Sequence, residues 1–128
     1  MRLLALVLVP LFCAGAAFAQ VEPGCEQQSG KANKEFVDNY NAAKASLEAR
    51  DWAAAIGGAA LARPHVLNGR QEEALIHIEV AAYHDAGNEA AMAERIAAYL
   101  ALPCTPAAIR KNYQSVLDKA RATAPAPQ

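Results

Sequence analysis

Residues 51–64 read DWAAAIGGAALARP, and residues 88–103 read NEAAMAERIAAYLALP. Each stretch begins with a residue type that caps helices, continues through small and apolar residues, and stops at a proline, which cannot continue a helix. Alanine has the highest helix propensity and fills about a quarter of the chain. An amphipathic segment and a short turn precede each stretch. The repeated pattern predicts two helical hairpins, in which an Ala-rich second helix packs back on the first.

The apolar residues recur at the spacing of one helix face, which predicts an all-α chain. Local signals set the bounds of the expected helices. The sequence NGRQ at 68–71 is a capping box, Gly87 suits the left-handed residue that closes a helix, and Thr105-Pro106 marks a helix start. Helices are expected over residues 31–49, 52–63, 68–85, 88–102 and 105–121. They form one helical domain over 31–121, between an irregular segment at 20–30 and a disordered tail at 122–128.

One face of each expected helix carries the residues of the core. Gly57 and Gly58 interrupt the second helix, where each glycine is less favourable than alanine by about 1 kcal/mol. Close approach of a neighbouring helix is the first explanation, and a hinge or helix break is the second. The expected buried faces are Phe36, Tyr40, Ala43 and Leu47; Trp52, Ala55, Ile56 and Ala59; Leu75, Ile78 and Ala82, with Ala74 and Ala81 beside them; Met92, Ile96, Tyr99 and Leu100; and Ile109, Tyr113, Val116 and Leu117.

Residues 1–19, MRLLALVLVPLFCAGAAFA, have the features of a signal peptide. Arg2 is the positive start, an apolar run follows, and Ala17-Phe18-Ala19 is a small-residue cleavage signal. A membrane-spanning helix needs roughly 20 apolar residues, and the run here is shorter and contains Pro10. A lipoprotein anchor is the other alternative, but the residues before Cys13 are too large for one. The sequence therefore predicts a mature chain that begins at Gln20 and is periplasmic or secreted.

Two cysteines, Cys25 and Cys104, remain after cleavage. In an exported protein an even pair is expected to be oxidised, and a disulfide here would close a loop of about 80 residues. The chain-entropy account gives such a bridge at most about 4 kcal/mol of stabilisation. A redox pair or a metal site is the alternative, but the chain has neither a C-x-x-C motif nor clustered histidines. We expect a disulfide between Cys25 and Cys104.

The charged residues give no sign of nucleic-acid binding or of catalysis. Without Arg2, 11 Lys and Arg stand against 13 Asp and Glu, a net charge of −2, so no global field attracts nucleic acid. His77 and His84 are seven residues apart, too far along a helix to share a metal ion. No nucleophile has a paired histidine in a recognisable context. The sequence therefore predicts no enzyme activity, metal or cofactor, and a solvent-exposed charged face for Glu72, Glu73 and Glu79.

The two Ala-rich units resemble those of the tetratricopeptide-repeat family, in which paired helices present a concave face to peptides or other proteins. The first unit carries the resemblance with Asp51-Trp52, Ala55, Ala59, Ala62 and Pro64, and the second with Asn88, Ala93, Ala97 and Leu100. Glu89 stands where that family has an aromatic residue. The units repeat every 37 or 38 residues against the family's 34, which makes the loop at 64–69 an insertion. The resemblance implies a right-handed stack that the fifth helix caps.

The expected function is non-catalytic binding of a peptide or protein partner, whose identity the sequence does not give. An enclosed helical bundle that binds a small ligand or metal, an inhibitor of a secreted enzyme, and an unrelated Ala-rich bundle remain alternatives. After signal cleavage no stable membrane insertion is expected. The contact face would come from the first helix of each hairpin, with candidate residues Asn33, Asn39, Asn41, Lys44, Gln71, His77 and Tyr83.

Overall fold

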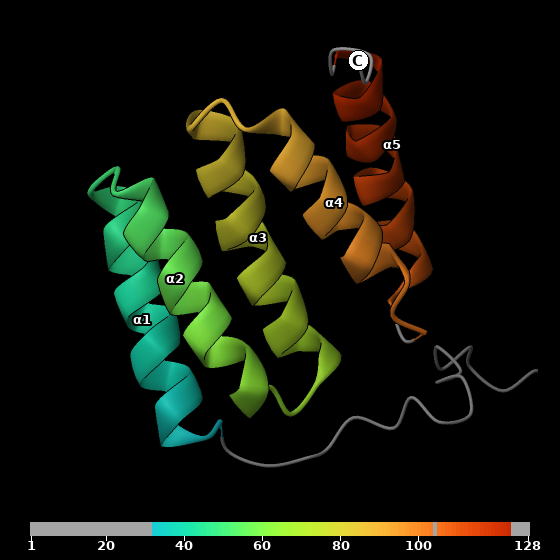
Figure 1. The fold of residues 1–128 in the computed structure, drawn as a ribbon. Coiled ribbons are helices and arrows are strands. Elements are labelled where there is room, and N and C mark those ends of the chain that lie inside the picture. Colours follow the sequence, from blue (N-terminus) through green and yellow to red (C-terminus); the bar gives the residue numbers. More distant parts are fainter. Residues whose placement is uncertain (1–31, 104, 124–128) are drawn as a thin grey trace, which may run out of the picture.

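The computed structural model describes residues 32–103 and 105–123, and within them every regular element is helical (Figure 1). The all-α prediction is confirmed for this part of the chain. The predicted signal peptide, the segment at 20–30, Cys25, Cys104 and residues 124–128 lie outside the described residues. The elements are α1 (Lys34–Glu48), α2 (Trp52–Ala62), a short 3-10 helix η1 (Arg63–His65), α3 (Gly69–Asp85), α4 (Glu89–Leu100) and α5 (Ala107–Thr123).

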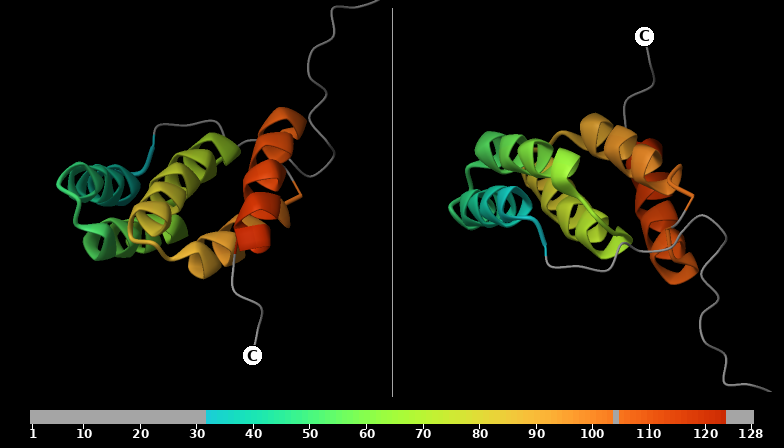
Figure 2. Two further views of the ribbon diagram at one scale, coloured as in Figure 1. Left: turned by 90° about the horizontal axis from the view of Figure 1, so that it is seen from above. Right: turned by 90° about the horizontal axis from the view of Figure 1, so that it is seen from below.

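Helix α3 lies at the centre of the arrangement. It contacts α1, α2 and α4, while α5 packs on α4. Seen along the helices, α2 and α4 lie on one side of α3, and α1 and α5 lie toward the other (Figure 2). We call the first side the α2/α4 face and the second the α1/α3/α5 face. Consecutive helices run in opposite directions, so the α1–α2 and α3–α4 turns meet at one end of the molecule (Figure 1).

The α1–α2 and α3–α4 turns have the same backbone geometry, 37 residues apart. The Asp51 amide donates to the Ser46 carbonyl at 2.9 Å, and the Asn88 amide donates to the Tyr83 carbonyl at 2.8 Å. The side chains of Asp51 and Asn88 then each accept an amide hydrogen bond three residues later, both at 3.1 Å. Both caps confirm the prediction, and the two turns are structurally equivalent.

The residue that closes each first helix has a positive φ, but its identity differs between the turns. Gly87 has φ 73°, as predicted, whereas Arg50 occupies the equivalent place with φ 60°. For a residue with a Cβ, this left-handed conformation is unfavourable by about 1–2 kcal/mol. The backbone of Arg50 is therefore strained, and this strain was not predicted from the sequence.

Helices α1 and α3 begin at polar caps. Asn33 accepts a hydrogen bond from the Glu35 amide at 2.8 Å, so α1 begins at Lys34 and not at residue 31. At the start of α3, the Asn68 side chain accepts from the Gln71 amide at 3.0 Å. The Gln71 side chain reaches back to the Leu67 amide at 2.7 Å. The predicted capping box is present, with its second bond displaced by one residue.

The α4–α5 connection differs from the expectation. Thr105 was expected to cap α5, but its hydroxyl donates to the carbonyls of Tyr99 and Leu102, at 3.2 and 3.3 Å, near the end of α4. The Arg110 guanidinium donates to the Leu100 carbonyl at 2.7 Å. These bonds satisfy carbonyl groups that a helix end leaves without intrahelical partners, and they tie α5 to α4. Helix α5 runs through Thr123, two residues beyond its expected end.

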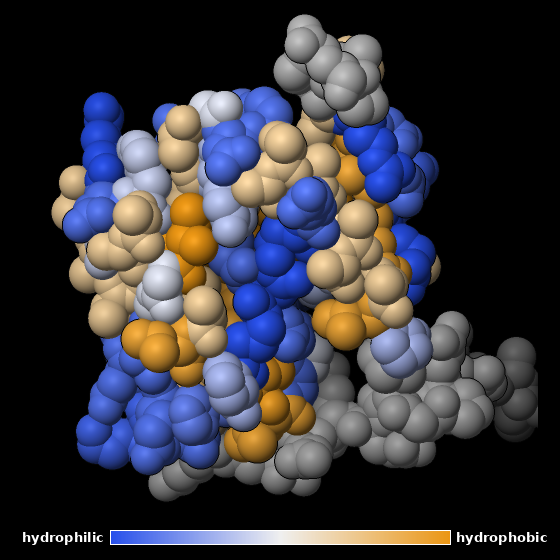
Figure 3. All heavy atoms as spheres, viewed as in Figure 1, coloured by the Kyte–Doolittle hydropathy of each residue, from blue (hydrophilic) through white to orange (hydrophobic). Residues whose placement is uncertain are grey.

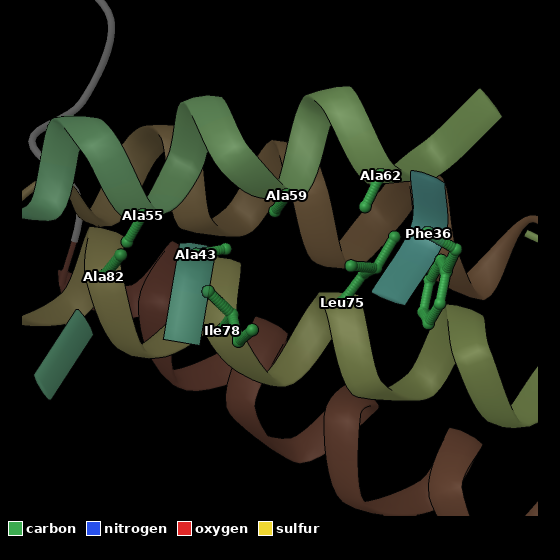
Figure 4. Close-up of a cluster of buried hydrophobic side chains, with 8 residues drawn as sticks. All are labelled: Phe36, Ala43, Ala55, Ala59, Ala62, Leu75, Ile78 and Ala82. Atoms are coloured by element: carbon green, nitrogen blue, oxygen red, sulfur yellow. The ribbon is translucent and has the colours of Figure 1, made fainter. Parts of the chain in front are cut away.

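Two hydrophobic clusters form the core, and α3 contributes to both. The first joins α1, α2 and α3, and the α2 residues that are buried in it are all alanines (Figure 4). The second joins α3, α4 and α5. The predicted stripe on α3 belongs to the first cluster, while Ile76, fully buried in the second, was not predicted. The buried members are Phe36, Ala43, Ala55, Ala59, Ala62, Leu75, Ile78 and Ala82 in the first cluster, and Ile76, Met92, Ile96, Tyr99, Leu100, Tyr113, Leu117 and Ala120 in the second.

The two glycines of α2 have different surroundings. A Cβ added to Gly58 would lie 2.9 Å from the Ala43 Cβ and 3.0 Å from the Ala43 Cα, so α1 and α2 approach too closely there for a larger residue. A Cβ added to Gly57 would meet no atom within 4 Å. The prediction of close helix approach is confirmed for Gly58, and it does not account for Gly57.

An ion-pair network occupies the α2/α4 face, where hydrophilic side chains gather between α2 and α4 (Figure 3). Glu79 of α3 is only 3% exposed and accepts hydrogen bonds from Arg63 and, at 2.7 Å, from Arg95. Glu72 lies 3.8 Å from the Arg95 guanidinium and 3.9 Å from that of Arg63. The prediction of a solvent-exposed face is therefore wrong for Glu79, because η1, directly after α2, and α4 each place a guanidinium beside its carboxylate.

Candidate functional site

A groove with charged side chains along an apolar floor runs between α1 and α3 on the α1/α3/α5 face. Its volume is about 530 Å³. Lys44 and Arg70 supply positive charges and Glu73 a negative one, while Leu47 and Ile78 give it an apolar floor. Its lining is Tyr40, Lys44 and Leu47 from α1, and Arg70, Glu73, Ala74, His77 and Ile78 from α3. The groove suits a ligand that presents both polar and apolar groups.

A second groove lies between α3 and α5 and is mainly apolar. Its volume is about 690 Å³. Val80 and Val116 form parts of opposite walls, and Met92 of α4 lines it as well. The polar side chains that line it are His77, His84, Glu89, Lys119 and Thr123, and the apolar ones are Val80, Ala81, Met92, Val116 and Ala120. Apolar side chains of a bound segment would be removed from water here, which is favourable.

His77 lines both grooves and so lies where they meet. Its side chain is 64% exposed, and its Nε2 is 3.6 Å from a carboxylate oxygen of Glu73. Its Nδ1 is 2.9 Å from the hydroxyl of Tyr113 on α5, which fixes the ring between the helices. The hydrogen bond between Nδ1 and the Tyr113 hydroxyl links α3 to α5.

The Tyr113 hydroxyl stays protonated at neutral pH and can therefore donate a hydrogen bond. Burial, with smaller contributions in the same direction from the charges of Tyr99 and Glu73, raises the pKa of Tyr113 to about 12. Burial also raises the pKa of Tyr99, whose ring packs edge-on against that of Tyr113 at 5.5 Å between centroids. Tyr113 therefore keeps its proton at neutral pH and links α5 to the exposed His77.

Replacing Tyr113 with phenylalanine is expected to remove the tyrosine that titrates near pH 12. The folded pKa lies above the unfolded value of about 10. The stabilisation linked to this proton is thus complete below pH 10 and is lost as the pH rises toward 12. Ultraviolet titration and denaturant unfolding at several alkaline pH values measure both effects. Tyr40→Phe is the control and should leave this titration in place. An unchanged alkaline titration in Tyr113→Phe would contradict the assignment.

The structure brings together only some of the candidate contact residues. Lys44 and His77 line the grooves. The caps already described engage the side chains of Asn33 and Gln71, and Asn39 donates to the Glu35 carbonyl at 2.8 Å. Asn41 is exposed on α1 but lines neither groove. Tyr83 lines a separate cleft near the two turns.

Most of the groove residues were not predicted as contact residues, although the sequence of α3 contains a signal for them. Arg70, Glu73, His77, Ala81 and His84 follow one another at spacings of three or four residues. Such a stripe lies on one helix face. The contributions of α5 have no comparable signal, because they depend on where α5 packs against the second hairpin.

Comparison with protein-family models, with curated proteins and with solved structures finds no match to this chain. Within residues 32–103 and 105–123, no three His, Cys, Asp or Glu side chains are grouped so as to hold a metal ion. None of the helices in this part of the chain combines the length and the apolar character that crossing a membrane requires.

Proposed function

We propose that the mature protein is an exported, non-catalytic scaffold that binds a peptide segment of a partner protein along the α1/α3/α5 face. The proposal rests on one observation: a groove that carries charged side chains and a more apolar groove meet at His77. Shallow neighbouring grooves of this kind fit an extended or helical segment better than a small molecule, which is usually enclosed over most of its surface. The predicted export and the predicted Cys25–Cys104 bridge belong to the same proposal.

The resemblance to tetratricopeptide repeats supports this choice of face. In a repeat stack, the first helices of successive units line a concave binding surface. Here α1 and α3 are the first helices of two hairpins whose turns are equivalent. The contact of Gly58 with Ala43 gives the close helix packing that such units need. Helix α5, packed on α4, takes the place of a capping helix.

The charge and hydropathy of the grooves define the partner. Apolar side chains of the bound segment would enter the α3/α5 groove, against Val80 and Val116. Polar side chains would lie over the α1/α3 groove, where Lys44 and Arg70 outnumber Glu73. We therefore propose a partner segment with apolar residues at one end and polar residues, including an acidic one, at the other.

The substitution Ala81→Glu tests this face directly. Ala81 lines the α3/α5 groove and is half-buried, so a glutamate there would fill the groove and place a charge in apolar surroundings. The matched control is Ala98→Glu, an exposed position on α4. Peptides selected from a random library on the mature protein should bind Ala81→Glu at least about tenfold more weakly, equivalent to 1.4 kcal/mol, and Ala98→Glu unchanged.

Calorimetric titration of the selected peptides measures these affinities, and circular dichroism confirms that both variants are folded. Lys44→Ala should weaken only those peptides that carry an acidic residue. Equal binding by Ala81→Glu and the parent protein would place the binding surface elsewhere and end the proposal.

A further inference from the structure

A separate cleft lies at the end of the molecule where the α1–α2 and α3–α4 turns meet. Its volume is about 610 Å³, and both hairpins contribute to it. None of its lining residues belongs to either groove. Its largest side chains are the only Trp of the chain, a Tyr, an Ile and a strained Arg. They are Trp52, Tyr83, Ile56 and Arg50, with Ala49, Asp51, Ala53, Ala86 and Asn88 around them. The cleft therefore combines aromatic walls with a cation.

The fold gives no sufficient reason for an arginine at position 50. The equivalent residue of the second turn is Gly87, which adopts positive φ without strain. Arg50 is exposed, and in the part of the chain that the structure describes it forms no ion pair. A cation after the end of α1 interacts favourably with the helix dipole, but a residue within the last turn would provide this without strain. Strained residues of this kind cluster at functional sites.

The side chains of Asp51 and Asn88, which also line the cleft, are already engaged. The Asp51 carboxylate accepts the Ala54 amide and the Asn88 side chain accepts the Ala91 amide, each at a helix start. The positive end of α2 compensates the charge of Asp51. Arg50 is thus the charged side chain left for a ligand. Trp52 and Tyr83 are half-buried and supply flat apolar surface beside it.

We propose that this turn cleft binds a carboxylate carried on an aromatic group, with the carboxylate at Arg50 and the ring against Trp52, Ile56 and Tyr83. A guanidinium pairs with a carboxylate through two parallel hydrogen bonds, and aromatic side chains add favourable ring contacts. Such a ligand is either a small aromatic acid or the C-terminal aromatic residue of a polypeptide. The site is independent of the grooves on the α1/α3/α5 face.

Fluorescence of Trp52 reports binding directly, because it is the only tryptophan. The probes are 3-phenylpropionate, its amine analogue phenethylamine, and N-acetyl-alanyl-phenylalanine as the free acid and as the amide. Each acid should change the emission saturably and bind at least about tenfold more tightly than its uncharged or cationic counterpart. Tighter binding of the small acid identifies a free acid as the ligand, and tighter binding of the peptide acid identifies a polypeptide C-terminus. An amine or amide that binds as tightly as its acid would overturn the proposal.

The variant Arg50→Gly separates a ligand-binding role from a structural one. It relieves the positive φ, so its melting temperature should rise by about 4–8 °C, while its affinity for the acids falls at least about tenfold. Arg50→Lys keeps the charge and should retain part of the affinity. Lys44→Ala, in the α1/α3 groove, should bind the acids normally. Unchanged acid binding by Arg50→Gly would overturn the proposal. The same variant should bind library-selected peptides on the α1/α3/α5 face normally, so a failure of the cleft proposal can be told apart from a failure of the proposed function.

Discussion

Replacing Glu79 with alanine is expected to lower the free energy of unfolding by about 3–5 kcal/mol. The carboxylate is 3% exposed and pairs with Arg63 and Arg95. Its removal leaves two guanidinium groups that are themselves mostly covered, with side-chain exposures of 32% and 16%. Glu72, the other carboxylate of the network, is nearly 4 Å from each arginine and replaces the lost bonds only in part.

Denaturant unfolding of residues 20–128 measures this loss. Glu94→Ala is the control, because Glu94 is exposed on α4 and its removal should change the stability by no more than about 0.5 kcal/mol. Glu79→Gln keeps the size of the side chain and should still lose most of the stabilisation, since the amide has no negative charge. If Glu79→Ala were as stable as Glu94→Ala, the network would contribute nothing to joining the two hairpins.

The adjacent glycines of α2 are expected to respond in opposite directions. Gly58→Ala should lower the free energy of unfolding by about 1–3 kcal/mol, because its Cβ meets the backbone and side chain of Ala43 and forces α1 and α2 apart. Gly57→Ala adds a Cβ in open space, so only the helix propensity changes. It should raise the stability by up to about 1 kcal/mol.

This pair of variants contains its own control, since both make the same chemical change one residue apart. Thermal unfolding followed by circular dichroism compares them under identical conditions. Similar effects of the two substitutions, whether stabilising or destabilising, would be inconsistent with the close α1–α2 approach at Gly58. Stabilisation by Gly57→Ala without any loss of binding would further show that this glycine has no role in a contact surface.

Features that depend on local sequence were predictable. Asp51, Asn68 and Asn88 cap helices and Gly87 closes one, because a cap involves only residues within about one turn. The helical periodicity likewise predicted the apolar face that each helix turns to its nearest partner in the hairpin. These signals were sufficient for the all-α prediction and for the bounds of most helices.

Features that depend on how hairpins pack on one another were not predictable from local pattern. Glu79 has the sequence context of an exposed residue, and only the positions of Arg63 and Arg95 make it buried. Ile76 faces the second cluster because α3 lies between two layers. For the candidate site, Lys44 and His77 were identified, but Gln71 is engaged in a cap. The α5 wall of the apolar groove required knowledge of where α5 packs.

Nuclear magnetic resonance titration of residues 20–128 with a library-selected peptide tests whether a peptide binds along the α1/α3/α5 face. We expect amide shifts to concentrate on α1, α3 and α5, with the largest changes near Lys44, His77 and Ala81. The α2/α4 face around Arg63 and Arg95 should be undisturbed. Shifts confined to the α2/α4 face, or no saturable shift with any selected peptide, would contradict binding along the α1/α3/α5 face.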